Sequence, residues 1–390
     1  MPAPSLSKGD VVITIVALHW YPYCIPLRNG FTTAHGPLHK RAGAIVELIT
    51  SAGIHGLGEI APLPEFAGSN LCEALSVLPA LAASWPGLTL KQAAEEIRAG
   101  LESGWLPPAA ACGLDTALLD AQGQLAQVNL TELMQREEQA ETVQQRLDIP
   151  VNAVIGTTDI EATIVKARQA VAAGFRCLKL KVGCDTHLEI ERIGALRAAI
   201  GPAIELRLDA NEAWSFEQAV TILTACIQFA IQYVEQPLKA TDLSGMRRLR
   251  QTVPIRIAAD EALHDLASAR NILAAEAADL LIVKPQLAGG LRMGRQIIRE
   301  GAALGIDSIV TSTIEAGIGL AAALHLAAAS PEITLACGLA TLPLLRDDLL
   351  TGSLVLKDGM LSVPSGAGLG VQLDRSALAR HASEALSLRG

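Results

Sequence analysis

Two lysines lie close together in a segment that otherwise reads as a buried strand. In RCLKLKVG (176–183), Lys179 and Lys181 share one side of the strand because successive side chains alternate, while Leu178 and Leu180 occupy the other. Burying a charged amine is costly unless the charge is paired. We therefore expect both lysines to point into a functional site, where one transfers a proton and the other tunes it.

Four more charged residues follow at a nearly constant spacing. Asp209 lies in IELRLDAN, Glu235 in YVEQP, Asp260 in IAADEA and Lys284 in IVKPQ, so that successive charges are 26, 25 and 24 residues apart. Each interval is about the length of one strand followed by one helix. We therefore expect each charge near the carboxyl end of its own strand, with the three carboxylates converging and Lys181 and Lys284 facing each other.

Three carboxylates in a poorly solvated site stay ionised together only beside a cation. All-oxygen ligation suits Mg²⁺, with Mn²⁺ as a possible substitute. Such a cation can hold a substrate carboxylate and the charge that develops when the adjacent carbon loses a proton. A lysine can take that proton if its pKa falls from about 10.4 towards neutrality, and nearby positive charge favours this fall.

Each of these residues also has an ordinary structural explanation. Asp209 or Asp260 alone could cap a loop, Lys284 could be a solvated strand end, and the two lysines of KLK could be ion-pair partners. Charges in register on five consecutive predicted strands are harder to explain as independent surface residues. The functional interpretation therefore rests on the whole set.

A strand–helix rhythm begins near residue 149 and predicts an α/β fold. Helical stretches such as DIEATIVKARQAVAAG separate eight candidate strands: IPVNAVIG, RCLKLKVG, IELRLDAN, IQYVEQP, IRIAADEA, LLIVKPQ, DSIVTSTIE and TLACGLAT. Eight such repeats predict a (β/α)₈ TIM-type barrel, whose catalytic residues gather at the carboxyl ends of the strands. A doubly wound open sheet is the alternative, although no GxGxxG motif supports nucleotide binding.

The segments on either side of the barrel differ from it. Strand-like runs followed by helical spacing predict an N-terminal α+β domain at residues 1–130, with the barrel at 131–350. The tail at 351–390 contains short strands and turns, so we expect it to return to the first domain or to cap the barrel.

The composition argues against several kinds of partner, cofactor site and cellular location. A net charge of −9 and a pI near 5.4 argue against nucleic acid as a partner. The seven cysteines form no CxxC pair and the eight histidines no HxxxH or HExxH, which argues against a disulfide framework and a zinc site. The apolar run at 317–329 is too short to span a bilayer, and the first ten residues do not resemble a signal peptide. We expect a soluble cytoplasmic protein, with a homo-oligomer possible.

Taken together, the motifs resemble the enolase superfamily, specifically its muconate-lactonizing subgroup with a KxK motif. KLKVG, LDANEAW, VEQP, ADEA and VKPQLAGG follow in family order, while GLGEIAPLP resembles the capping domain and ALLDAQGQL the helix that enters the barrel. The family uses a lysine or histidine base with Mg²⁺. The resemblance implies these roles: metal ligands Asp209, Glu235 and Asp260; acid/base Lys181; opposing lysine Lys284; supporting residues Lys179, Asn211 and Glu261.

Within this subgroup the sequence is most similar to the o-succinylbenzoate synthase family of menaquinone synthesis. GEIAPLPEF, Arg207 in RLDAN, KPQLAGG and TSTIEAGIGL carry the similarity. It implies a lyase that forms an enediolate and performs syn dehydration of 2-succinyl-6-hydroxy-2,4-cyclohexadiene-1-carboxylate, with Lys181 removing the α-proton and helping the hydroxyl to leave. In that family the opposing lysine stabilises the enediolate from the other face.

Several alternatives remain open at this point. N-succinylamino acid racemases share the synthase framework and are the closest alternative, and Glu315 suits a muconate cycloisomerase equally well. Dipeptide epimerases usually carry DxD on strand 8, which LACGLATLP lacks. A non-catalytic binding protein on a barrel would be expected to lack a ligand or a lysine, and none is missing.

Substrate contacts are expected from loops and inward side chains. The segments 24–36 and 61–66 suit a lid or ordinary turns, and Arg207 suits either a substrate contact or internal packing. Gly289 and Gly290 could present backbone amides to a succinyl carboxylate, or simply form a βα turn. The expected partner is a small-molecule carboxylate.

Overall fold

The structure is a computed structural model that describes residues 12–33, 36–63, 70–138, 146–156, 159–183 and 185–387. Within these ranges, the side chains of residues 29–33, 36–37 and 383–387 are not described. Parts of the two expected lid segments, residues 34–35 and 64–66, lie outside the described residues, as does Cys184.

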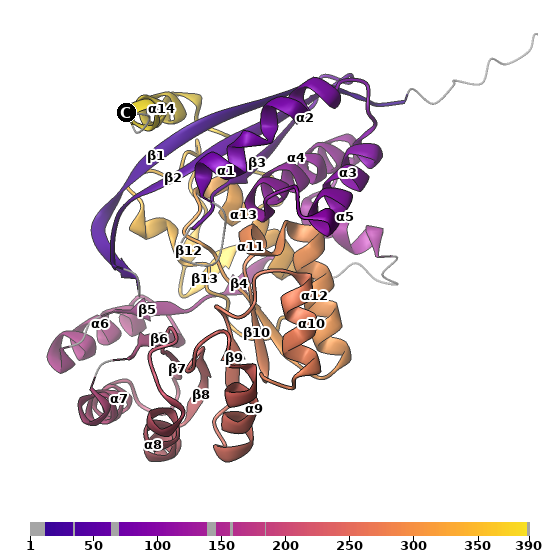
Figure 1. Cartoon of the computed structure of the whole chain (residues 1–390). Coiled ribbons are helices and arrows are strands. Elements are labelled where there is room, and N and C mark those ends of the chain that lie inside the picture. The colour runs from indigo at the N-terminus through magenta and orange to yellow at the C-terminus, as the bar shows by residue number, and fades with distance from the viewer. Residues whose placement is uncertain are drawn as a thin grey trace, which may run out of the picture.

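The N-terminal part combines an antiparallel sheet with helices that pack against it (Figure 1). The strands are β1 (Ile15–Thr33), β2 (Gly36–Thr50) and β3 (His55–Ile60), in the order β1-β2-β3. The helices are α1 (Leu71–Ser76), α2 (Leu78–Ser84), α3 (Leu90–Ser103) and α4 (Pro108–Ala126). Helices α1 and α2 are separated at Val77, because Pro79 lies in the first turn of α2 and lacks an N–H for a continuous helix.

Two glycines let β3 lie directly on α4. A Cβ atom at Gly58 would come within 1.8 Å of the Gly113 carbonyl oxygen, and one at Gly56 within 2.1 Å of the Ala117 carbonyl oxygen. Only glycine fits at such a close backbone approach. The GLGE segment therefore joins the sheet to the helix that leads towards the barrel.

The second part is built on a parallel sheet, as the strand–helix rhythm predicts. Its strands, in spatial order, are β5 (Ala153–Ile155), β6 (Cys177–Lys181), β7 (Glu205–Asp209), β8 (Ile231–Glu235), β9 (Ile257–Ala259), β10 (Leu280–Val283) and β11 (Asp307–Val310). The helices are α5 (Leu130–Glu137), α6 (Ile160–Ala172), α7 (Thr186–Ile200), α8 (Phe216–Cys226), η1 (Ile227–Phe229), α9 (Leu243–Thr252), α10 (Leu266–Ala274), α11 (Pro285–Ala288), α12 (Leu291–Ala303), α13 (Gly317–Ala329) and η2 (Leu342–Leu344). Leu206 and Leu208 are fully buried on the face of β7 opposite Arg207 and Asp209.

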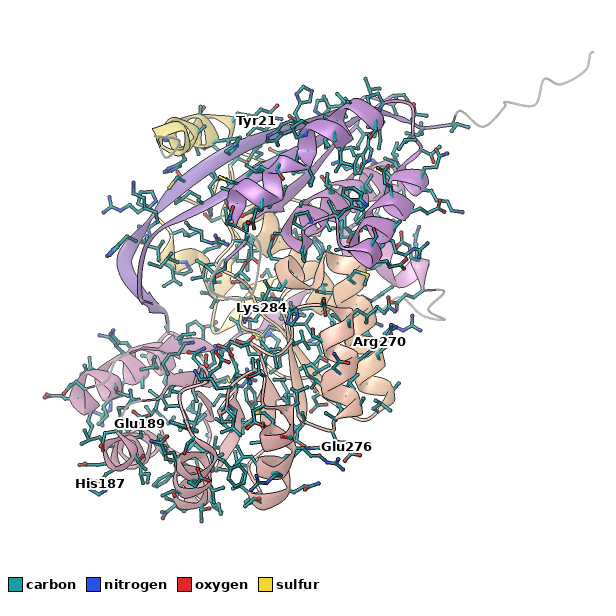
Figure 2. All side chains as sticks on the ribbon, in the orientation of Figure 1. Tyr21, His187, Glu189, Arg270, Glu276 and Lys284 are labelled. Carbon is teal, nitrogen blue, oxygen red and sulfur yellow. The ribbon has the colours of Figure 1, made fainter. Side chains whose placement is uncertain are left out.

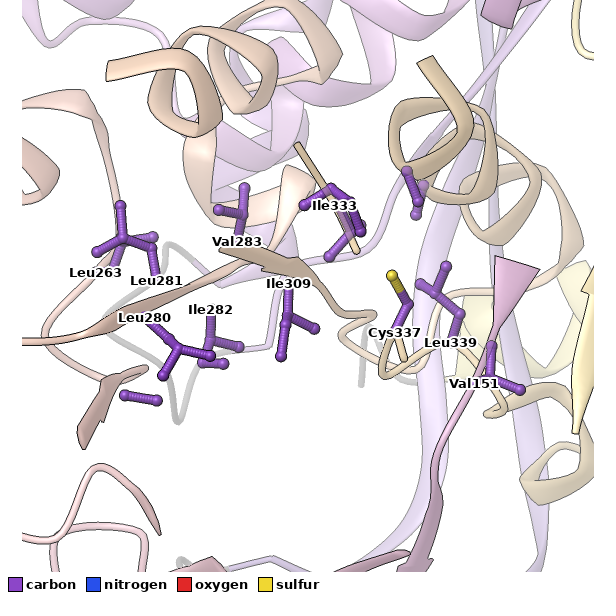
Figure 3. Close-up of a cluster of buried hydrophobic side chains, with 14 of the residues drawn as sticks. Val151, Leu263, Leu280, Leu281, Ile282, Val283, Ile309, Ile333, Cys337 and Leu339 are labelled. Carbon is purple, nitrogen blue, oxygen red and sulfur yellow. The ribbon is translucent and has the colours of Figure 1, made fainter. Parts of the chain in front are cut away.

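A short segment around Cys337 closes the sheet into a ring. Cys337 forms a parallel bridge with Val151, just before β5, and Gly338 forms one with Thr311, just after β11. In Figure 3, Cys337 and Leu339 lie between Val151 and Ile309. The predicted eighth strand is thus in its expected place but pairs through single bridges, and the TIM-type barrel is confirmed.

The C-terminal segment contacts both parts of the molecule. Strands β12 (Leu356–Lys357) and β13 (Met360–Ser362) form a small sheet with β4 (Asp148–Pro150), which leads into the barrel. Helix α14 (Arg375–Ser387) then lies along β1 (Figure 1). Within the described ranges, no helix is long and apolar enough to cross a membrane.

His325 on α13 is expected to make the fold sensitive to acid. It is fully buried, its Nε2 donates to the Leu369 carbonyl at 3.0 Å, and its Nδ1 lies 2.9 Å from the Thr131 hydroxyl. Burial lowers its pKa from 6.5 to about 4. The unfolded chain therefore binds more protons between these values, and about 3 kcal/mol of stability is lost as the pH falls through the folded-state pKa.

The measurement is thermal unfolding of the wild type and of His325→Gln at pH 7.5 and pH 4.5. Burial raises the pKa of Glu59 to about 7 and of Asp120 to about 6, and these two groups favour the fold as the pH falls. Both proteins contain Glu59 and Asp120, so the difference between their changes in thermal midpoint reports the effect of His325. We expect the midpoint of the wild type to drop by a few degrees more than that of His325→Gln; equal drops would contradict the assignment.

Candidate active site

Three carboxylates meet at the carboxyl ends of three neighbouring strands. Asp209 ends β7 and Glu235 ends β8, where the two are register partners, and Asp260 directly follows β9. All three are at most 2% exposed. The structure thus places the three predicted metal ligands at the ends of three neighbouring strands.

The predicted lysines contact these carboxylates from both sides. Lys181 Nζ lies 2.6 Å from Asp209 Oδ2, while Lys179 Nζ lies 3.0 Å from the same oxygen and 2.9 Å from Glu235 Oε1. Lys284, just after β10, forms an ion pair with Asp260. Because β6 and β10 are four positions apart in a closed ring of eight, Lys181 and Lys284 approach from opposite sides.

Two sets of hydrogen bonds hold the lysines and carboxylates in place. Asn211 accepts a hydrogen bond from Lys181 at 2.7 Å and donates one to Glu261 Oε1 at 2.8 Å. Gln236, which the sequence analysis did not single out, accepts hydrogen bonds from the backbone amides of Asp260 and Ala262 at 3.0 and 3.2 Å. Its position directly after Glu235, in the VEQP motif, is the signal that could have identified it.

The backbone also bends sharply after two of these strands. Asn211, Glu212 and Gln236 have φ values of 42°, 64° and 35°, a region that residues other than glycine rarely adopt. Strain of this kind is found at functional sites, where the surrounding structure maintains it. Here the turns direct Asn211 to the Lys181 amine, and Gln236 to the backbone amides of Asp260 and Ala262.

Burial and mutual repulsion set the charge state of the carboxylates. Burial, reinforced by the charges of Asp209 and Asp260, raises the pKa of Glu235. Burial opposes ionisation of Asp209 too, but Lys179 and Lys181 outweigh it and lower its pKa. Burial likewise disfavours the charge on Lys179, yet Asp209 and Glu235 raise its pKa well above the usual value. The neighbouring carboxylates therefore favour the protonated form of Lys179 over its neutral form.

The end of the barrel that carries the lysines meets the N-terminal sheet. Figure 2 shows Lys284 at the level where the two parts meet, whereas Arg270 and Glu276 lie at the outer surface. Two residues after Lys284, Gln286 donates to the Glu59 carbonyl at 2.8 Å and accepts from the Ala61 amide at 2.9 Å.

A second buried contact fixes the same junction. Arg41, 3% exposed, donates to the carbonyl oxygens of Thr313 and Ile314 on the barrel and to that of Pro62 on the N-terminal part. The strand that leads to residue 63 is thereby held against the mouth of the barrel.

Glu315 lies at this junction between the N-terminal part and the barrel. Its two carboxylate oxygens accept hydrogen bonds from the Thr313 amide and hydroxyl, each at 2.9 Å, and it is 1% exposed. Its neighbour Glu59 accepts bonds from the amides of Ala316 and Gly319 at the start of α13. These hydrogen bonds fix the side chains of Glu315 and Glu59 at the junction.

Gly289 and Gly290 form the turn between α11 and α12. Both amides donate to the Pro285 carbonyl, at 3.1 and 3.0 Å, and both φ values are positive, 91° and 125°. A Cβ atom at Gly290 would lie 2.7 Å from Asp115 of α4. The structure thus shows the βα turn that was the alternative to carboxylate recognition.

Arg207 lies deeper in the barrel than the lysines and contacts its amino-terminal end. It is fully buried and donates to Gln232 at 2.6 Å and to the Ala336 carbonyl at 2.7 Å. These contacts correspond to internal packing, one of the two roles expected for Arg207.

Comparison with known proteins identifies the family. Residues 162–377 match the family described as enolase C-terminal domain-like, and residues 16–121 match the MenC N-terminal domain. The first match alone spans more than half of the chain. The chain belongs to the enolase superfamily.

Relatives within the superfamily differ in activity. The hydrophobic dipeptide epimerase of Enterococcus faecalis is 31% identical over 89% of this chain and 96% of that protein. The o-succinylbenzoate synthase of Thermobifida fusca is 36% identical, but over 55% of this chain and 66% of that protein.

Solved structures of the superfamily share the whole fold. The Enterococcus faecalis epimerase complexed with Mg and the dipeptide L-Leu-L-Tyr has a TM-score of 0.85 and 31% identity, covering 92% of this chain and 99% of that one. The N-succinyl Arg/Lys racemase of Bacillus cereus has a TM-score of 0.87 and 25% identity, covering 94% and 98%.

The donor set of this superfamily member suits a divalent cation. Glu235 and Asp260 are buried carboxyl groups whose pKa values burial and like charge raise, and the buried Glu261 Oε2 has no hydrogen-bond partner. Such groups call for positive charge. In this structure the lysines supply that positive charge. Within the described ranges, no three His, Cys, Asp or Glu residues are arranged so that they could hold a metal ion.

Proposed function

We propose that the chain abstracts an α-proton from a small carboxylate substrate, with Lys181 as the acid/base and Mg²⁺ as cofactor. The observation that carries the proposal is the pair of amines, Lys181 and Lys284, on opposite sides of the carboxylates Asp209, Glu235 and Asp260. Amines on two faces of a substrate carbon can each exchange a proton with it.

Exposure favours Lys181 as the base. Its side chain is 25% exposed, compared with 12% for Lys179 and 6% for Lys284. Asp209 and Asn211 both accept from its amine and so fix its direction. Lys179 remains protonated beneath it, and Lys284 can stabilise negative charge from the other side.

Asp209, Glu235 and Asp260 would hold the cation, and Glu261 would support it through its free oxygen. Mg²⁺ is bound in the epimerase structure from Enterococcus faecalis, and all-oxygen donor sets suit it. When bound, the ion would neutralise the buried carboxylates and stabilise the charge that develops on the substrate carboxylate.

For the overall reaction we propose o-succinylbenzoate synthase activity. Lys181 takes the α-proton as a C–H bond breaks, and then donates a proton to the hydroxyl that leaves on the same face. The products are o-succinylbenzoate and water, so atoms and charge balance. The MenC N-terminal domain match at residues 16–121 and the 36% identity to the Thermobifida fusca synthase support this choice.

Dipeptide epimerisation is the second candidate. The match to the Enterococcus faecalis epimerase, which extends over 89% of the chain, favours it, and lysines on two faces suit removal and return of a proton. The segment at 334–341 contains no acidic residue that could hold a substrate ammonium group there. For this reason we place the synthase first.

The test is an assay of three substrate types with Mg²⁺ and with EDTA. The substrates are the cyclohexadiene precursor of o-succinylbenzoate, N-succinyl amino acids and hydrophobic dipeptides. We expect dehydration of the precursor to be fastest and to stop in EDTA. Rapid dipeptide epimerisation without dehydration would contradict the synthase assignment and favour the epimerase. Activity that EDTA does not reduce would contradict the proposal that the enzyme needs a divalent cation.

A further inference from the structure

The backbone that carries Lys181 is held by a buried ion pair on the next helix. Arg192 Nη2 of α7 donates to the Lys181 carbonyl at 2.7 Å, and Glu189 Oε2 accepts from the Gly183 amide at 3.3 Å. These two backbone groups lie on either side of Val182, at the end of β6. The end of β6 is therefore tied to α7 at two positions.

The pair itself is almost completely buried. Arg192 Nη2 lies 2.8 and 3.1 Å from the two carboxylate oxygens of Glu189, and the two side chains are 2% and 1% exposed. Their spacing of three residues places both on the buried face of α7, which also carries Ile193 and Leu196. Taking two charges out of water is so costly that apolar residues of similar volume often stabilise a fold equally well or better. Stability alone therefore does not explain this pair.

The two hydrogen bonds act where the pairing of β6 within the sheet becomes one-sided. The register of β5 with β6 ends at Leu180, whereas β7 pairs with Lys181 itself. The Val182 amide then donates to the Asp209 carbonyl of β7 at 2.9 Å. The ion pair of α7 therefore supports the strand end beyond its last pair with β5.

The same backbone packs closely against the turn that directs the Lys181 amine. Gly183 has a φ of 121°, and a Cβ atom there would lie 2.6 Å from the Cβ atom of Ala213. Ala213 lies in the turn after β7, which also carries Asn211, and Asn211 accepts a hydrogen bond from the Lys181 amine at 2.7 Å. A shift of the Gly183 backbone would therefore disturb both Lys181 and the turn that directs it.

We propose that Glu189 and Arg192 are positioning residues for Lys181, because their pair fixes the strand end from which its amine extends. The inference rests on the proposed role of Lys181 as the acid/base. Reacting atoms must lie about 3–3.5 Å apart, and a misplacement of about 1 Å costs about a hundredfold in rate. The pair acts on the backbone from the helix side, so it favours the chemical step and not the affinity for substrate.

The test is a double variant, Glu189→Leu with Arg192→Met, which removes both charges and both backbone hydrogen bonds. Removing the charges together avoids leaving one of them buried without its partner, so the thermal midpoint should equal or exceed that of the wild type. With Mg²⁺ present, kcat should nevertheless fall at least about tenfold, while KM stays within about twofold. Arg192→Lys should retain kcat within about threefold, because the contacts to Lys181 and Glu189 come from a single nitrogen that an ammonium group can replace.

Amide hydrogen exchange, followed by NMR, provides a readout that needs no turnover. Exchange at Val182 should be at least about tenfold faster in the double variant than in the wild type, with no change at Ile282 on β10. Arg250→Met with Asp279→Leu is the matched control, because this ion pair, at 2.5 Å, also holds a backbone amide, that of Ile257, but at the start of β9. The control should keep the wild-type kcat and the wild-type exchange at Val182.

Wild-type kcat in the double variant, a rise in KM without loss of kcat, or unchanged exchange at Val182 would overturn the proposal. A kcat for Arg192→Lys as low as that of the double variant would also overturn it. A thermal midpoint that falls together with kcat would do the same, by giving the pair a purely structural role. Absence of turnover in the wild type would overturn the proposed function instead, whereas faster exchange at Val182 in the double variant would still support the fixing of the strand end by the pair.

Discussion

Replacing Lys181 with methionine is expected to lower α-proton exchange by roughly a thousandfold, the contribution of a general base. The variant keeps the length of the side chain but loses the amine that lies 2.6 Å from Asp209. Lys179 still pairs with Asp209 at 3.0 Å, so the fold should remain intact. Deuterium incorporation from D₂O into substrate, followed by NMR, measures the exchange directly.

Lys166→Met is the matched control, because Lys166 is exposed in the middle of α6. It should exchange at the wild-type rate. Undiminished exchange in Lys181→Met, with wild-type circular dichroism in both variants, would move the base to another residue.

Two neighbouring carboxylates are expected to affect stability in opposite directions. In EDTA at pH 8, Glu235→Gln should raise the thermal midpoint by a few degrees, because burial and the charge of Asp209 raise the pKa of Glu235 and make its ionised form unfavourable in the fold. Asp209→Asn should lower the midpoint, because Lys179 and Lys181 stabilise ionised Asp209 and lower its pKa.

Both variants should nevertheless lose activity by at least about a hundredfold, since each removes an oxygen donor from the proposed cation site. Thermal unfolding and steady-state rates with Mg²⁺ measure the two effects. If both variants lose stability in EDTA, the repulsion among the carboxylates is not the dominant force. If Glu235→Gln retains wild-type activity, Glu235 is not a ligand.

The barrel could be predicted from the sequence because each strand combines two regular signals. Alternation places leucines such as Leu206 and Leu208 against the helices and charged residues inside, while the 24–26-residue spacing sets the register of the strand ends. These are local properties of the chain. The convergence of Asp209, Glu235 and Asp260 in the structure follows from them once the strands are parallel neighbours.

Contacts between distant segments could not be predicted in the same way. The bridges of Cys337 and Gly338 involve single residues, so they leave no strand-length pattern. Arg41, Glu59 and Gln286 join the N-terminal part to the barrel mainly through backbone groups, which any sequence possesses.

The alternation of side chains along a strand also does not show how deep a residue lies inside the barrel. Arg207 and Asp209 face the same way, yet Asp209 contacts Lys181 while Arg207 contacts the Ala336 carbonyl towards the amino-terminal end of the barrel. The difference in depth between the two residues could be seen only in the three-dimensional structure.

Diffraction from crystals soaked in MnCl₂, with anomalous data to locate the ion, would test the central arrangement most directly. The account predicts one Mn²⁺ with Asp209, Glu235 and Asp260 as ligands, and with the amines of Lys181 and Lys284 on opposite sides of it. An ion bound elsewhere, or the three carboxylates still paired with lysines at saturating Mn²⁺, would contradict the account.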